Sequence, residues 1–120
     1  MKKTILWFNL PEDHDYPAAL SYLSLIMEVE SAKAVVKMLQ DAPITYFNAK
    51  DICRAAGLPM LGIENRHVAK NLSKIETDKQ LSPILLVRGE NQKLIIADGY
   101  HRTCAVHHFN EDAVVPAKLV

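Results

Sequence analysis

The residues with the most chemical potential lie together in the stretch Asp98-Gly99-Tyr100-His101-Arg102, between an apolar run and a helical pattern. A helix that starts directly after a strand presents unpaired backbone N–H groups and the positive end of its dipole, which favours an anion. Gly99 lets the backbone approach a phosphate closely because it has no Cβ. Arg102 offers a planar set of donors that matches phosphate oxygens, and the charge of His101 is adjustable near neutral pH. The turn is therefore predicted to bind a phosphate.

Asp98 has two interpretations at this turn. It could accept a hydrogen bond from the first turn of the following helix as an N-cap, or it could hold Mg²⁺ against the phosphates of a nucleotide. The cap interpretation has the stronger basis, because aspartate is common at that position. Asp98 and His101 are the candidates for a catalytic role, and the pattern does not decide between them.

A zinc site is the competing chemical interpretation. His101, Cys104 and His108 fall at i, i+3 and i+7 on one helix face, and all three residue types bind zinc. A fourth ligand would have to come from residues 12–15, and an i, i+7 pair spans about 10 Å, too far for one zinc ion. Cys104 is more simply a small buried hydrophobe. We therefore expect no protein-bound metal here, apart from Mg²⁺ at Asp98.

A second set of polar residues follows one side of a predicted helix over residues 65–75. Its apolar positions recur at intervals of four and three and should face the core, which places the polar positions in a row on the opposite side. Such a row is either a solvated face or part of a binding site. The row consists of His67, Lys70, Asn71 and Lys74.

These residues have to be positioned by the helices and strands around them. The mixture of expected strands and helices predicts an α+β (mixed α/β) fold, with a small mixed sheet flanked by helices. With 120 residues, the chain is expected to form one small domain over residues 1–120. Pro116 predicts that the last strand lies near an edge of the sheet. Strands are expected over residues 4–8, 83–87, 93–97 and 113–119. Helices are expected over residues 17–40, as one helix or as two broken near Ser31, and over residues 48–57, 65–75 and 100–109.

Composition limits the classes of function. The chain has 14 lysine and arginine residues and 14 aspartate and glutamate residues, so no field of one sign attracts nucleic acid or a charged membrane. The longest uncharged run, residues 16–27, is too short to cross a bilayer. Two cysteines in a chain with 49% hydrophobic residues favour a reducing, cytoplasmic setting.

The order of parts from Leu72 to Val120 resembles the ParB/sulfiredoxin-like superfamily. The shared order is a short helix, a Ser-Pro-Ile strand, a hairpin, a strand ending in a glycine turn with His-Arg, a helix, and a closing Val-Pro-Ala-Lys-Leu-Val strand. Residues 63–68 are similar to the asparagine-containing segment that opens the ParB N-terminal-like domain. The resemblance is strongest over residues 63–120, which leaves 1–62 as an N-terminal strand and helices packed on that domain.

This resemblance implies a binding site for nucleotide phosphates or an equivalent anion. The glycine, histidine and arginine of the turn hold the anion in that superfamily, and the helix before the Ser-Pro-Ile strand adds contacts in sulfiredoxins. The binding residues expected here are Gly99, Tyr100, His101, Arg102, His67, Lys70 and Lys74.

The branches of the superfamily imply different activities. Sulfiredoxins carry their catalytic cysteine at the position of Tyr100, so reduction of sulfinic acids is not expected. ParB partition proteins append a helix-turn-helix and a dimerisation region, for which 120 residues leave no room, so direct nucleic-acid binding by this chain alone is not expected. ParB-like free serine kinases have an Asp-Gly-His-His-Arg turn, the version most similar to residues 98–102.

Two functions of different classes follow. The leading expectation is a small cytoplasmic protein that binds a nucleotide or a phosphorylated small molecule, with phosphoryl transfer or nucleotide hydrolysis assisted by Mg²⁺ as the reaction class. The alternative is a non-enzymatic regulatory or interaction module with a degenerate site, related to DNA partition or transcription. In that case, the apolar helix at residues 17–27 would dock a partner or a second copy, giving a homodimer.

Overall fold

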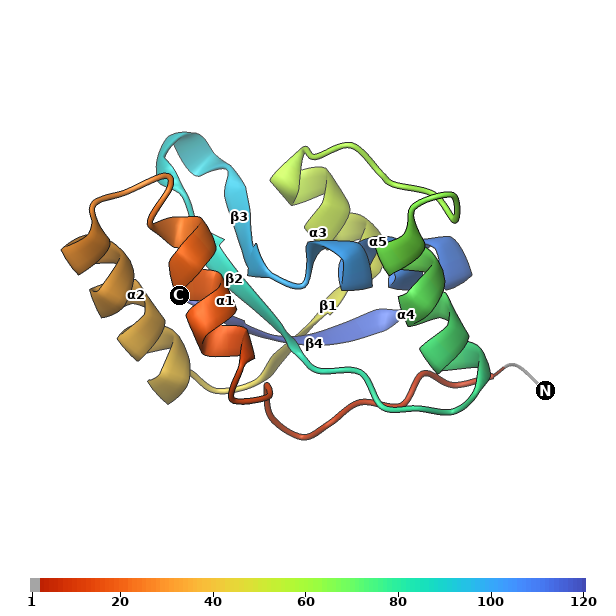
Figure 1. Ribbon diagram of the computed structural model, residues 1–120. Helices are drawn as coiled ribbons and strands as arrows, with labels where there is room; N and C mark the ends of the chain where they lie inside the picture. Colours follow the sequence, from red (N-terminus) through yellow and green to blue (C-terminus); the bar gives the residue numbers. More distant parts are fainter. Residues whose placement is uncertain (1–2) are drawn as a thin grey trace.

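Helices cover both faces of a central sheet in the computed structural model, which describes residues 3–120 (Figure 1). None of the helices in this range is long and apolar enough to cross a membrane. The helices are α1 (Asp15–Leu23), α2 (Val29–Asp41), α3 (Ala49–Ala56), α4 (Arg66–Glu76) and α5 (Tyr100–Phe109). The strands are β1 (Thr45–Asn48), β2 (Ile84–Arg88), β3 (Leu94–Asp98) and β4 (Val114–Leu119), and a 3₁₀ turn (Glu90–Gln92) joins β2 to β3.

The sheet is mixed, with the strand order β1-β4-β2-β3. The hairpin of β2 and β3 is antiparallel, and α5 then carries the chain back so that β4 runs parallel to β2. β1 pairs antiparallel with the other side of β4. The prediction of an α+β domain with a small mixed sheet flanked by helices is thus confirmed.

The central strand β2 explains why both faces of the sheet are buried. Ile84 and Leu86 pack with α3, α4 and α5 in one hydrophobic cluster, whereas Leu85 and Val87 pack with α1 and α2 in another. A strand covered on both faces reads as a continuous apolar run rather than an alternating one. The layers of Figure 1 therefore follow directly from the sequence of β2.

The C-terminal helices match their predicted positions closely. α4 begins after Asn65, whose side chain accepts hydrogen bonds from the N–H groups of His67 and Val68. α3 ends with Gly57 as its C-cap, and the positive φ of 64° at this residue is the left-handed conformation that glycine adopts readily. α5 occupies the predicted residues 100–109.

The N-terminal part departs from prediction in three places. The predicted strand over residues 4–8 is extended chain with an isolated bridge from Trp7 to Leu81. The predicted helix over residues 17–40 is two helices, and the break falls at residues 24–28 rather than near Ser31. β1 was not predicted: residues 45–47 were assigned to no element, and Asn48 was assigned to the helix over residues 48–57.

The last strand was predicted near an edge of the sheet, and β4 is not an edge strand itself but lies second from the edge, between β1 and β2. Pro116 is tolerated there because the parallel ladder to β2 begins one residue later, at Ala117. On the other side, Pro116 lies opposite Tyr46 of the edge strand β1. The proline lacks an N–H just before the ladder to β2 begins, so no hydrogen bond of that ladder is lost.

Candidate functional site

A polar cavity of about 210 Å³ lies where α5 begins, and we call it the turn cavity. It brings together the predicted turn and the predicted polar row, because α4 packs beside α5. Lys70 is exposed on α4 and lies outside the described lining, whereas the other row members line the cavity. The lining consists of Glu12, His14, His67, Asn71, Lys74, Gln80, Leu81, Ser82, Asp98, Gly99, Tyr100, His101 and Arg102.

The turn itself depends on Gly99. This residue has a φ of 105° and is the N-cap of α5. A Cβ atom there would lie 2.5 Å from Cγ2 of Ile84 and 2.9 Å from Nη1 of Arg102. Residues with a side chain rarely adopt this backbone conformation. Glycine is therefore required both for the turn and for the tight packing beneath it.

The predicted N-cap role of Asp98 is wrong. Asp98 is the last residue of β3, and the chain turns at Gly99, which takes the cap position instead. The Asp98 carboxylate faces Arg102, and its Oδ2 atom lies 3.5 Å from Nη2. This oxygen is buried without a hydrogen-bond partner among the described residues, so the contact with Arg102 is an ion pair only.

Arg102 lies in a network of protein groups beside the cavity. Its Nη1 donates to the carbonyl oxygen of Ser82 at 3.0 Å, and Nη2 also lies 3.6 Å from Oδ1 of Asp15. Asp15 is buried at the start of α1 and accepts hydrogen bonds from the Glu12 N–H at 2.9 Å and from the Ser82 hydroxyl. The Arg102 side chain is only 15% exposed, and through these contacts it links separate segments as well as lining the cavity.

The environment of Asp98 makes its carboxyl group titratable near neutral pH. Burial is the main cause, the Arg102 guanidinium opposes it, and the neighbouring Asp15 adds to it. Together they raise the pKa of Asp98 from 3.8 to about 7. A carboxyl group of this kind can accept or donate a proton under physiological conditions.

Two imidazole rings form the other titratable feature of the cavity. The ring centroids of His67 on α4 and His101 on α5 are 4.8 Å apart. Burial, with a further contribution from His67, lowers the pKa of His101. The ring of Tyr100 lies 5.4 Å from His101, and its hydroxyl donates to the carbonyl of Pro59, which ties the start of α5 to the loop before α4.

Sequence interpretation missed the contribution of the N-terminal segment to the cavity. Glu12 and His14 belong to the lining, and Nε2 of His14 lies 3.1 Å from Oε2 of Glu12 and 3.5 Å from Oδ1 of Asp15. The acidic and histidine residues at 12–15 were considered only as a source of a fourth zinc ligand. The clustering of acidic and histidine residues in this segment is the sequence signal for a site. Which other residues join them depends on long-range packing, which the sequence pattern does not give.

The residues considered for zinc do not meet at one point. Cys104 is buried in the hydrophobic cluster under α5, where burial raises its pKa. Within residues 3–120, no group of three or more histidine, cysteine, aspartate or glutamate side chains could hold a metal ion.

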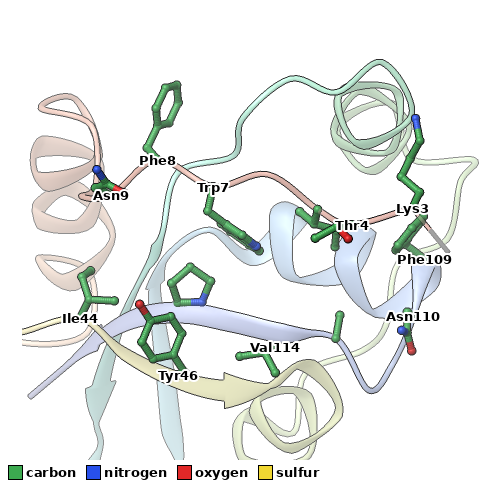
Figure 2. A pocket seen from close by; sticks show the side chains of 13 residues that line it. Lys3, Thr4, Trp7, Phe8, Asn9, Ile44, Tyr46, Phe109, Asn110 and Val114 are labelled. Carbon is green, nitrogen blue, oxygen red and sulfur yellow. The ribbon is translucent and has the colours of Figure 1, made fainter. Parts of the chain in front are cut away.

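A larger cavity of about 430 Å³ lies elsewhere, and we call it the aromatic groove. The N-terminal segment runs along one side of it, and β1 and β4 run along the other (Figure 2). Its rings include Trp7, Tyr46 and Phe109, and its charged lining residue, Lys3, pairs with Asp78 at 3.4 Å. Among the described residues, the lining of the aromatic groove has no cluster of titratable side chains like the one in the turn cavity.

No family model, no curated protein and no solved structure matches this chain. The resemblance to the ParB/sulfiredoxin-like superfamily therefore remains a prediction from the order of parts.

Proposed function

We propose that this protein binds the phosphate end of a nucleotide or another phosphorylated small molecule in the turn cavity. The observation that carries the proposal is the convergence of the α5 N-terminus with His67, His101 and Lys74 on one polar cavity. Backbone N–H groups at a helix start, a lysine and two imidazoles are donors that suit phosphate oxygens. Lys74 and the helix dipole attract the anion, and the imidazoles can become protonated when it binds.

The size of the cavity supports a ligand that is only partly enclosed. Its volume of about 210 Å³ lies below the range of roughly 300–1,000 Å³ that is usual for pockets that bury a whole cofactor. The phosphate end fits the polar interior, while a base or other group would lie outside. We also propose the ParB/sulfiredoxin-like fold for this domain and a cytoplasmic setting.

The proposed reaction class is phosphoryl transfer or nucleotide hydrolysis. Asp98 and His101 are the candidates for moving a proton, because both line the cavity, the pKa of Asp98 is raised to about 7, and the lowered pKa of His101 favours a neutral ring that can accept a proton. Asp98 is a poor ligand for Mg²⁺ for two reasons. The Arg102 guanidinium already pairs with its carboxylate, and the raised pKa of Asp98 disfavours the ionised form that Mg²⁺ would need. Any Mg²⁺ would therefore enter with the nucleotide's phosphates rather than wait at a protein site.

Lys74 and Lys70 provide a matched pair of variants for the test. Both lie on α4, but Lys74 lines the cavity and Lys70 does not. Lys74→Ala is expected to weaken binding about tenfold through loss of a charge-assisted contact, whereas Lys70→Ala should leave affinity unchanged. The measurement is calorimetric titration with ATP, ADP, CTP and GTP, each with and without Mg²⁺, and with pyrophosphate.

Absence of binding with all of these ligands would overturn the proposal. Equal losses in the two lysine variants would show a non-specific attraction to the surface and would overturn it as well.

A second candidate function is self-association through the connection between α1 and α2. Leu25 is 83% exposed, and Tyr22, Ile26 and Val29 beside it are exposed too. Such an apolar patch is typical of an interface, here with a second copy of the chain. Sedimentation of the wild type and of Leu25→Glu over a range of concentrations tests this function, since only a dimer formed through the patch would dissociate in the variant.

A further inference from the structure

The His67–His101 pair makes the charge of the turn cavity depend on its occupant. The two rings come from different helices and both line the cavity, with their centroids 4.8 Å apart. Two imidazolium ions at this distance repel each other, so the empty pair resists double protonation. A dianion beside both rings would remove that repulsion and favour the charged forms.

We propose that the His67–His101 pair takes up a proton when a dianionic phosphate group binds, so that affinity for the dianionic form increases as the pH falls from about 8 to about 6. This inference rests on the proposed phosphate site and adds its regulation. The cavity would thereby select a phosphate monoester or terminal phosphate, which carries two charges, over a singly charged phosphodiester.

The other charged groups around the pair set its behaviour. Lys74 on α4 and Arg102 on α5 oppose protonation of the imidazoles, whereas Glu12 and Asp98 favour it. The remaining titratable groups of the lining are His14 on the N-terminal segment and Tyr100 beside His101. Because the pKa of His101 is lowered, its ring is mostly neutral at pH 7 before a ligand arrives.

Asp98 is the competing source of proton uptake. Its pKa of about 7 means that an approaching anion could protonate this carboxyl group instead of the histidines. Variants at the two histidines separate the sources, because they leave the carboxyl group in place.

The experiment is calorimetric titration of the full chain with sodium sulfate, which stays a dianion throughout this range and so contributes no proton of its own. Titrations at about pH 7 in two buffers of different ionisation enthalpy give the number of protons taken up. We expect about 0.5–1 proton per sulfate for the wild type, and almost none for the double variant His67→Gln/His101→Gln. His108→Gln, a change on the exposed end of α5, should retain the full uptake.

The outcomes separate this inference from the proposed function. Failure of sulfate, phosphate and every nucleotide to bind would overturn both. Binding without proton uptake, or with unchanged uptake in the double variant, would overturn the role of the histidines and leave the phosphate site standing.

A second measurement covers the case in which the double variant does not fold. His67 is exposed, so His67→Gln alone should retain the fold. Removing its charge should raise the pKa of His101, measured by an NMR titration of the imidazole. An unchanged pKa would show that the two rings are not coupled and would overturn the inference.

Discussion

At the scale of single residues, Asp98 combines two opposing effects. Its carboxylate balances the charge of Arg102, but it lies in a buried position where ionisation is costly. The raised pKa shows that burial outweighs the attraction to Arg102. The carboxyl group is thus held in a state that suits proton transfer better than tight ion pairing.

This balance predicts how the stability of the protein depends on pH. The folded protein binds a proton at Asp98 up to about pH 7, whereas the unfolded chain loses it near 3.8, so stability falls as the pH rises between these values. Asp98→Asn removes this cost. The variant should gain melting temperature over the wild type, little at pH 4 and most at pH 7 and above.

Thermal unfolding of both proteins across this pH range tests the prediction. A gain that is constant with pH, or one that is largest in acid, would contradict the raised pKa of Asp98.

At the scale of elements, Arg102 links parts of the chain that are far apart in sequence. It joins the start of α5 to the start of α1 and to the segment that enters β2. Its substitution would therefore remove the guanidinium group that faces the buried Asp15, in addition to any loss of ligand contacts. For this reason, Lys74 is the better probe of binding.

Arg102→Ala is expected to lower the free energy of unfolding by about 3 kcal/mol, since removal of one partner from a buried charge network is strongly destabilising. Arg54→Ala is the control, because the pair of Arg54 with Asp51 lies on the exposed surface of α3 and should contribute little. Urea unfolding gives both values. A similar, small loss in the two variants would show that the Arg102 network does not stabilise the fold.

Several elements were predictable because their signals are local. The limits of α3 and α4 coincide with Asn48, Gly57 and Asn65, which are residue types common at helix ends. Of the two asparagines, Asn65 caps its helix through its side chain, whereas Asn48 makes no such hydrogen bond within the described residues. The place of β4 inside the sheet was not predictable, because strand order depends on how α5 returns the chain and not on Pro116. The four-residue strand β1 is stabilised by its pairing with β4 rather than by its own sequence.

At the scale of the whole molecule, the turn cavity contains some residues that local sequence patterns predict and others that only the tertiary structure brings there. The turn at Gly99 and the row with His67 and Lys74 were predicted separately, and packing of α4 beside α5 brings them together. Glu12 and His14 were missed as cavity residues, because their position depends on contacts between the N-terminal segment and residues around Leu81. The N-terminal half of the chain thus contributes to the same site.

NMR can determine directly which of the two cavities binds phosphate. Titration of the ¹⁵N-labelled full chain with inorganic phosphate should shift the backbone amide signals of Tyr100, His101 and Arg102 at the start of α5, together with that of His67. The amides of Trp7 and Tyr46, which line the aromatic groove, should not move. Shifts confined to the aromatic groove, or the absence of shifts at the start of α5, would contradict a phosphate site in the turn cavity.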